Sequence, residues 1–436
     1  MQPQNLDESV RFACGSCTFC CDQPWHTLIE ADKAQALDRH DFSAYPHLVG
    51  RDLYDKGTCE KEGFHRLAKG EGTRCLFLDA DDLCIIHKEL GPEAKPHMCR
   101  QFPYLAAHTW VDDRVSANYG CPSVQAQDGP PLSDHVSEMA SRVPRTQRDP
   151  KPDAPVPLDK TCALTPAEND ALFDRAVSLF DPEHDADVWG RFAELLALLV
   201  GVREYKTAAT RSDNGQPDAL VDLLRSGQAL PDAPDVPEIR GYPQPGQSPM
   251  QARFLFAATL YPDTVPPDAV TAMGLFKRLT LIPKLMALAT LSGTYASRLF
   301  GRNIPIDQVM AHQVDEDLDA AATQLLVRYF RSRLWQRYLA GTRLTVTAGI
   351  HQHIHDLNAI VFLARAEAQH TSASRLTEPI IRNALTGVEF HLANQARLFN
   401  QTLKGWFRTQ LQRPELALAS LRLMALRPAH EPVDAS

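Results

Sequence analysis

The sequence lacks any long uninterrupted run of apolar residues. A membrane-spanning helix needs roughly 18 to 20 of them in succession, and the 436-residue chain has no run of that length. The first residues, MQPQNLDESVRFACG, also lack the basic segment and apolar core of a secretory signal. We therefore expect a cytoplasmic protein without a membrane span, in a reducing compartment where thiols stay free or hold metal.

Positive charge is also scarce. The chain has 45 lysines and arginines against 54 aspartates and glutamates, a formal net charge of -9. This deficit argues against non-specific binding to nucleic acid and against docking on an anionic membrane. Glycine-rich phosphate loops, the nucleophile elbow of hydrolases and the dinucleotide-binding fingerprint are absent from the sequence as well. A protein partner or a protein substrate is therefore the favoured kind of binding partner.

Cysteine is absent from the whole chain after Cys162. Of the ten cysteines, nine lie between Cys14 and Cys121. This uneven distribution predicts a cysteine-cluster metal-binding domain over residues 1–125. A module with a modest apolar core can take much of its stability from metal–thiolate bonds. We therefore expect a small, metal-stabilised α+β module followed by a mainly α-helical region.

Proline and glycine divide the rest of the chain. The segment QDGPPLSDHVSEMASRVPRTQRDPKPDAPVPL is polar and rich in proline, which is typical of an extended linker. A helix should begin after it, because Thr165 suits an N-cap, Pro166 the first helical position and Glu168 a capping box. Further on, LFKRLTLIPKLMALATLSGTYASRLF predicts one or two helices that kink or break at Pro283. The predicted order is a Pro-rich linker (126–163), a helical segment (164–230), a Pro/Gly-rich linker (231–250) and a helical domain (251–427).

The stretch RFACGSCTFCCDQP concentrates four cysteines. Cys14, Cys17 and Cys20 form a C-x2-C-x2-C run, and a proline follows the distant Cys121. Such a run with a remote Cys-Pro is a known ligand order for iron–sulfur clusters. Cys21 is adjacent to Cys20, and neighbouring side chains of an extended chain point to opposite faces. We therefore expect Cys21 either to face a second metal or to be a structural or redox thiol beside the first site.

Three further cysteines occur downstream. The run CLFLDADDLC predicts two short strands around an Asp-rich turn, a hairpin that brings Cys75 and Cys84 together. Cys99 follows in KPHMCRQFPY. Zinc takes four ligands in a tetrahedron, so the cysteines allow one fully cysteinyl site with spares, or two sites. Zinc and an iron–sulfur cluster both remain open.

Four separated blocks carry a family resemblance: CGSCTFCC, CLFLDADDLCIIH, KPHMCRQFP and GCP. In this order they resemble the cysteine-cluster family with a CxxCxxCC opening (the YkgJ-type family), which is described as zinc- or iron-chelating. Cys59 lies outside the family pattern. Carried over residue by residue, the resemblance implies metal ligands at Cys14, Cys17, Cys20, Cys21, Cys75, Cys84, Cys99 and Cys121.

A second resemblance concerns the flagellin lysine-N-methylases. These proteins also carry a helical C-terminal region, and LLVRYFRSRLWQRYL is similar to a segment of theirs. The resemblance implies an alternative function, a protein lysine N-methylase-like enzyme that uses the cluster together with S-adenosylmethionine. No catalytic residue can be assigned from it. The N-terminal cysteine spacing here is the CxxCxxCC form, which differs from the wider spacing of the flagellin enzymes.

Some charged residues near the cysteines have two interpretations. His87 and His97 lie close to Cys84 and Cys99, and each could complete a site or orient a sulfur ligand. Arg100 could neutralise the negative charge of a thiolate cluster or be an ordinary surface residue.

The helical half offers two hypotheses of its own. In GIHQHIHDLN, a helix would place His351 and His355 on one face, and a strand would add His353. These histidines are either a second metal site or residues near the N-terminal turn of a helix that are solvated or hydrogen-bonded.

The segment LLVRYFRSRLWQRYL predicts a helix with a buried stripe of Leu326, Phe330, Leu334 and Tyr338. Its arginines either recognise phosphate or nucleic acid or are solvated above buried aromatics. They are Arg328, Arg331, Arg333 and Arg337.

Overall fold

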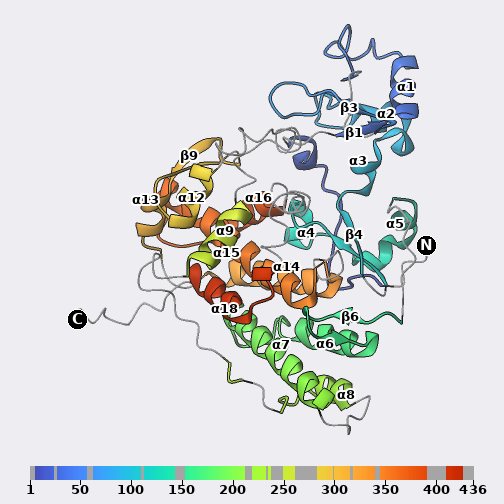
Figure 1. Cartoon of the computed structure of the whole chain (residues 1–436). Coiled ribbons are helices and arrows are strands. Elements are labelled where there is room, and N and C mark those ends of the chain that lie inside the picture. The colour runs from blue at the N-terminus through green and yellow to red at the C-terminus, as the bar shows by residue number, and fades with distance from the viewer. Residues whose placement is uncertain are drawn as a thin grey trace. The chain divides into compact units, whose positions relative to one another are not determined.

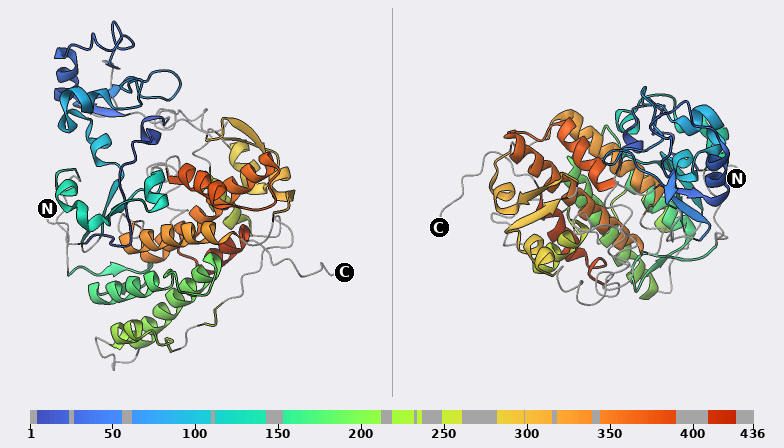
Figure 2. Two further views of the ribbon diagram at one scale, coloured as in Figure 1. Left: turned by 180° about the vertical axis from the view of Figure 1, so that it is seen from behind. Right: turned by 90° about the horizontal axis from the view of Figure 1, so that it is seen from above.

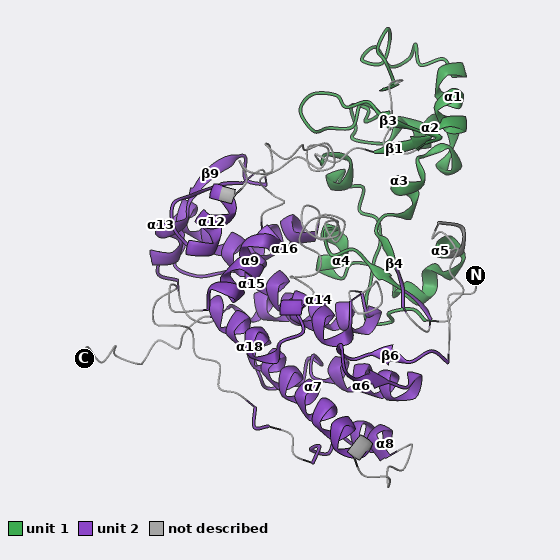
Figure 3. Cartoon of the chain, in the orientation of Figure 1, with its two compact units in different colours: residues 1–106, 115–147 green, residues 107–114, 148–436 purple. Residues whose placement is uncertain are grey.

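The computed structural model of the chain divides into two compact units (Figure 1, Figure 3). Unit 1 comprises residues 1–106 and 115–147, and unit 2 comprises residues 107–114 and 148–436. The residues that the structure describes are 5–23, 27–55, 62–109, 112–142, 153–211, 219–231, 234–236, 249–260, 282–297, 299–314, 318–338, 344–389 and 409–425.

Unit 1 mixes short strands with short helices. Its elements are η1 (Phe19–Cys21), β1 (Leu28–Glu30), α1 (Ala31–Arg39), β2 (Tyr54–Asp55), β3 (Phe64–Leu67), α2 (Ile85–Leu90), η2 (Pro92–Ala94), α3 (His97–Gln101), α4 (Pro122–Ala126), η3 (Leu132–His135) and α5 (Val136–Arg142). The chain passes between the units within the paired strands β4 (Tyr104–His108) and β5 (Asp113–Ala117). The α+β character predicted for the N-terminal region is confirmed. Its stabilisation by metal stays a prediction.

The core of unit 1 lies between a three-stranded sheet and two helices. The strands run in the order β1-β3-β2, all antiparallel, with Leu28 opposite Arg66. Ile29, Leu37, Phe77 and Ile85 are almost completely buried in one apolar cluster. Because the strands are only two to four residues long, this sheet alone has little hydrogen-bonded framework.

The segment 126–163 differs from the extended linker that the composition predicts. Its described part contains η3, α5 and the first strand of a small hairpin, β6 (Val156–Pro157), which pairs with β7 (Ala163–Leu164). Pro130 and Pro131 precede η3 rather than interrupt it, and proline is tolerated before a helix. The second predicted linker, 231–250, lies largely outside the described residues, and the other domain boundaries stay predictions.

Unit 2 is mainly helical, as the sequence predicts. Its helices are α6 (Pro166–Ser178), α7 (Val188–Arg211), α8 (Ala219–Ser226), α9 (Met250–Leu260), α12 (Ile282–Thr290), α13 (Ile306–Ala311), α14 (Ala320–Gln336), α15 (Val346–Thr371), α16 (Glu378–Gly387) and α18 (Pro414–Leu423). The expected capping box begins α6, with the Thr165 side chain accepting from the Glu168 backbone and Glu168 returning the bond. Among the described residues, no helix combines the length and apolarity needed to cross a membrane.

A hairpin interrupts the helices where the sequence predicts helix. Pro283 is the second residue of α12, a position that tolerates proline. The strands β8 (Thr294–Ser297) and β9 (Arg302–Pro305) then pair antiparallel. Gly293, which directly precedes β8, and Gly301, in the turn before β9, both have positive φ. A positive φ at Gly293 ends the helix inside the stretch predicted to be helical.

Helix α15 is the centre of unit 2, and Figure 2 shows the helices of this unit from two further sides. It packs against α9, α13, α16 and α18. Phe362 of α15 contacts Phe256 edge-to-face, with ring centroids 5.6 Å apart. On α14, Phe330 contacts Phe192 in the same way at 4.9 Å. Leu326, Phe330 and Leu334 are buried, which confirms these positions of the predicted stripe.

Candidate metal centre

The CxxCxxCC segment forms a compact turn rather than an extended strand. Ser16 and Thr18 have φ values of 51° and 55°, a left-handed conformation that few non-glycine residues adopt. Thr18 is the N-cap of η1, and the Cys21 backbone N–H donates to the Thr18 carbonyl at 2.7 Å. Cys14 and Cys17 are exposed, whereas Cys20 and Cys21 are half-buried.

The turn differs from the extended conformation that was expected from the sequence for the adjacent cysteines. In η1 the Sγ atoms of Cys20 and Cys21 lie 3.9 Å apart, within hydrogen-bonding distance. An extended chain would have turned them to opposite faces, but the 3-10 conformation brings them together. The two thiols therefore affect each other's ionisation directly.

Backbone hydrogen bonds join the second cysteine block to the first. The Cys75 N–H donates to the Cys21 carbonyl at 2.9 Å. Thr73 donates its hydroxyl to the Asp22 carboxylate at 2.6 Å. These contacts hold Cys75 beside the turn that carries Cys21.

The predicted hairpin around the Asp-rich turn is present in a shorter form. Asp79 accepts hydrogen bonds from the backbone N–H groups of Asp81 and Leu83, at 3.0 and 2.8 Å, and so closes the turn. Cys84 forms a bridge opposite Leu78 rather than opposite Cys75. The second strand is only this bridge, because α2 begins directly after Cys84.

Two of the cysteines stand at helix starts. Cys84 is the N-cap of α2, and Cys121 is the N-cap of α4 with Pro122 as its first residue. Burial raises the pKa of Cys121 to about 11, while the N–H groups of Val124 and Ser123 act in the opposite direction. Unpaired N–H groups at a helix start favour a thiolate, so these positions suit an anionic sulfur ligand.

Electrostatic interactions relate Cys99 to three other thiols. Burial raises the pKa of Cys99, and negative charge on Cys21, Cys75 and Cys84 raises it further. Burial likewise raises the pKa of Cys75 to about 11, with smaller contributions in the same direction from Cys21 and Cys84. These four buried or half-buried sulfurs therefore oppose one another's ionisation.

The remaining thiols interact around Cys121. Charge on Cys17 and Cys14 raises the pKa of Cys121, after the larger effect of burial. Cys20 connects the two groups. Its pKa is raised first by the hydrogen bond with Cys21, then by burial, and then by charge on Cys21, Cys99 and Cys121.

This donor set fits a metal ion chemically. Several thiols that cannot ionise together without a countercharge are what a bound cation relieves, because a coordinating thiol is deprotonated outright. As they stand, however, no three or more Cys, His, Asp or Glu side chains in the described ranges lie close enough to hold one ion. The eight-cysteine ligand set therefore stays a prediction. The nine described cysteines are free of disulfides, and Cys59 lies outside the described residues.

Positive charge near the thiols comes from residues that the sequence does not single out. The pKa of Cys21 is lowered to about 7, first by the hydrogen bond with Cys20 and against the effect of burial. Lys95, Lys69 and Arg74 contribute to this lowering. Arg100, the candidate from sequence, instead forms an ion pair with Glu93.

The histidines beside the cysteines stay candidates only. His87 is exposed on α2. The backbone N–H of His97 donates to the Glu30 carboxylate at 3.2 Å.

The three histidines of α15 are packed in the helical core. His351 uses both ring nitrogens, Nδ1 with the Leu411 carbonyl and Nε2 with the Ser420 hydroxyl, each at 3.1 Å. The Nδ1 of His353 lies 3.3 Å from the Asp356 carboxylate. The His351 and His355 rings are stacked with centroids 5.0 Å apart. All three are buried, not solvated. Of the predicted alternatives, hydrogen bonding holds for His351 and His353.

Three of the four arginines singled out from the sequence form ion pairs. Arg331 of α14 bonds Asp181 at 2.9 Å, and Arg337, the C-cap residue of α14, bonds Asp170 at 2.6 Å. Arg333 is buried and pairs with the buried Glu389. The expectation of solvated arginines is therefore wrong for the buried Arg333 and Arg337, whereas Arg331 is partly exposed.

Comparison with known proteins relates the cysteine-rich region to a family. Residues 13–122 match the model of the CxxCxxCC family, described as "Putative zinc- or iron-chelating domain". An uncharacterized protein of Methanocaldococcus jannaschii is 28% identical over 104 residues, which are 24% of this chain and 33% of that protein. The flagellar biosynthetic protein FliU of Salmonella muenchen is 41% identical over 54 residues, 12% of this chain and 31% of FliU.

The chain thus spans about a third of the length of each of these relatives. No solved structure matches it. Four cysteine blocks in the family order, within one continuous match, identify the N-terminal region. Residues 13–122 are a domain of the CxxCxxCC family.

Proposed function

We propose that the chain is a metal-binding protein whose CxxCxxCC domain holds two ions or clusters, each on four thiolates. One site takes Cys14, Cys17, Cys20 and Cys121. The other takes Cys21, Cys75, Cys84 and Cys99.

The grouping of the thiols carries this proposal. Charge on Cys21, Cys75 and Cys84 raises the pKa of Cys99, and charge on Cys21 and Cys84 raises that of Cys75. These four thiols match in number the four ligands that one tetrahedral site needs. Cys14, Cys17 and Cys121 form a second group that lacks a fourth sulfur. Cys20 interacts electrostatically with thiols of both groups. We assign it to the second group because that group needs a fourth sulfur. This assignment restores the C-x2-C-x2-C order with a remote Cys-Pro that iron–sulfur ligation uses.

The two groups meet at adjacent residues. Cys20 and Cys21 differ by one position, and their sulfurs are 3.9 Å apart. Lys69, Lys95 and Arg74 favour thiolate at Cys21 and offset the negative charge of a four-thiolate site. When bound, zinc would supply folding free energy, whereas an iron–sulfur cluster would add electron transfer.

Metal analysis of the full chain purified without oxygen tests the proposal. Brown protein with broad visible absorbance identifies iron–sulfur, and colourless protein with about two zinc ions per chain identifies zinc. Cys17→Ser and Cys121→Ser should each lose the same half of the metal, and Cys75→Ser and Cys99→Ser the other half. Cys162→Ser, which changes a half-buried cysteine of unit 2, is the matched control and should keep both halves.

The same experiment can contradict the proposal. If Cys17→Ser or Cys99→Ser retained all the metal, the ligand assignment would be wrong. If each of them lost everything, one shared site would replace the two.

We also infer that the helical unit 2 recognises a protein partner or a protein substrate, and that the protein works in the cytoplasm. The free state of the nine described cysteines supports a reducing compartment. No sequence motif in the helical unit indicates the chemistry of this partner.

A second candidate function rests on the similarity to FliU. Here the chain would be a protein lysine N-methylase-like enzyme that uses the cluster and S-adenosylmethionine. The test is mass spectrometry of flagellin incubated with the metal-loaded chain and S-adenosylmethionine. A gain of methyl groups on lysine supports this function. Unchanged flagellin in the presence of fully loaded protein counts against it.

A further inference from the structure

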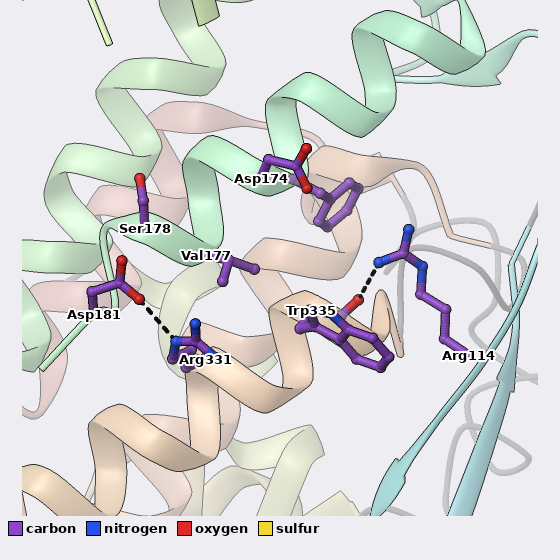
Figure 4. Close-up of a pocket in the computed structure, with 8 residues that line it drawn as sticks. Arg114, Asp174, Val177, Ser178, Asp181, Arg331 and Trp335 are labelled. Carbon is purple, nitrogen blue, oxygen red and sulfur yellow. Dashed lines mark hydrogen bonds and ion pairs between the residues drawn. The ribbon is translucent and has the colours of Figure 1, made fainter. Parts of the chain in front are cut away.

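A pocket of about 220 Å³ opens between α6 and α14 (Figure 4). All its lining residues belong to unit 2, including Arg114 at the end of the segment 107–114. Pockets for drug-sized ligands run from about 300 to 1,000 Å³, so this one suits a smaller group. Arg114 is the one lining residue that falls within the CxxCxxCC match, and the others come from residues 173–181 and 331–335. No function proposed above uses this pocket.

Two arginines are held in fixed positions in this pocket. The Nε of Arg331 bonds the Asp181 carboxylate at 2.9 Å. The Nε of Arg114 bonds the Asp112 carboxylate at 2.9 Å.

Arg114 has a second anchor on α14. One of its terminal N–H groups donates to the Trp335 carbonyl at 3.0 Å, and its guanidinium lies 5.3 Å from the Trp335 ring centre. Arg331 is therefore oriented through its Nε, and Arg114 through its Nε and one terminal nitrogen. Among the residues that the structure describes, the other terminal nitrogen of Arg114 and both terminal nitrogens of Arg331 have no partner.

The negative charges of the pocket come from the opposite wall. Asp174 on α6 and Asp181 just after it face the pocket, and Val177 lies between them (Figure 4). Asp174 is exposed and has no ion pair within the described ranges. The acids thus belong to α6 and its following loop, whereas the bases belong to α14 and β5.

The balance of charge limits the ligand. Two carboxylates and two guanidiniums line the pocket. Arg331 already pairs with Asp181, so a bare phosphate would still meet Asp174 and a lone lysine side chain would still meet Arg114. Like charges placed close together cost free energy. A ligand with one charge of each sign and an apolar body avoids this cost, because it can place each charge against the opposite wall and its body against Val177 and Trp335.

We propose that this pocket binds a free α-amino acid with an apolar side chain. Its ammonium faces Asp174, its carboxylate faces the terminal N–H groups of Arg114, and its side chain contacts Val177. Charge-assisted hydrogen bonds of this kind are the strong ones, and they require both head groups of the ligand.

Calorimetry on the full chain with L-leucine tests the proposal. Leucinamide, which lacks the carboxylate, and N-acetyl-leucine, which lacks the ammonium, should each bind about tenfold to a hundredfold more weakly. Asp174→Asn should weaken L-leucine binding by a similar factor. Asp185→Asn, which neutralises an exposed carboxylate outside the pocket, is the matched control and should bind as the unmodified chain does.

Several outcomes would overturn this inference. They are no binding of L-leucine at millimolar concentration, equal binding by Asp174→Asn, equal binding of leucinamide, and displacement of L-leucine by sulfate alone. Because Asp174 is exposed, the Asp174→Asn chain should melt at the same temperature as the unmodified chain, which keeps a loss of binding interpretable.

Discussion

The two units of the chain accommodate buried polar groups in opposite ways. In unit 2, buried charges have protein partners, as Arg333 has Glu389 and Lys206 has Glu168 at 2.8 Å. In unit 1, the buried polar groups around the turn are thiols whose pKa values burial and mutual charge raise. These ion pairs of unit 2 are complete within the chain. Under the proposed function a bound cation would complete the thiol group of unit 1, so the two units should respond differently to the same treatments.

Metal removal should separate the units most strongly. Structural zinc contributes roughly 10 kcal/mol or more to the folding of small modules, and the core of unit 1 is small. We expect chelation to unfold residues 62–109, with loss of hydrogen-exchange protection there, while α15 stays protected. Equal loss of protection in both units would show that their stabilities are not independent. Full protection in unit 1 after verified metal loss would show that the metal does not contribute to the stability of this unit.

Breaking the buried ion pair should affect unit 2 alone. Arg333→Met leaves the carboxylate of Glu389 buried without its partner, which costs about 3–5 kcal/mol. Urea unfolding followed by circular dichroism should show this loss. Arg331→Met removes an ion pair of α14 that is partly exposed, and its cost should stay within about 1 kcal/mol. Similar values for the two variants would contradict the difference in burial.

Acid should destabilise unit 2 through its buried histidines. Burial lowers the pKa of His351 to about 4, and burial next to His351 lowers the pKa of His355. The unfolded chain binds protons near the ordinary histidine pKa of about 6.5, whereas the folded chain stays neutral there. Stability should therefore fall as pH drops from about 6.5 toward 4, by up to about 1.4 kcal/mol per pH unit for each such group.

Denaturant midpoints measured from pH 7 to pH 4.5 check this slope. His355→Phe removes one titrating ring, keeps an aromatic side chain in the same place, and should flatten the curve. An unchanged slope in that variant would assign the acid sensitivity to other groups.

The smallest effect should come from a helix cap. Thr165→Ala removes the hydroxyl that caps α6 and should lower the stability of unit 2 by about 1 kcal/mol. Thr377 is the N-cap residue of α16 but makes no side-chain cap bond, so Thr377→Ala is the matched control. Thermal unfolding of the two variants should show a decrease only for Thr165→Ala.

Local patterns predicted much of this molecule. The spacing of the cysteines identified the region that the family model matches, and Thr165 with Glu168 predicted the start of α6. Each of these features depends on residues a few positions apart, or on a motif that can be recognised whatever the rest of the sequence is. Such signals can be read without knowing the fold.

Other features depend on contacts that a sequence does not display. The left-handed conformations of Ser16 and Thr18 turn Cys20 and Cys21 together, and neither residue type signals that conformation. The partner of Arg333 lies 56 residues away at Glu389. The arginines of this segment therefore suggested a solvent-exposed basic surface, whereas acidic residues distant in the sequence pair with Arg331, Arg333 and Arg337 in the fold.

The adjacent positions of Cys20 and Cys21 have a mechanical consequence. A peptide bond links them directly, so a shift of one sulfur on gaining or losing its ion must rotate the backbone that carries the other. Under the proposed assignment, filling one site would prearrange the other, and metal would be taken up cooperatively rather than in two independent steps.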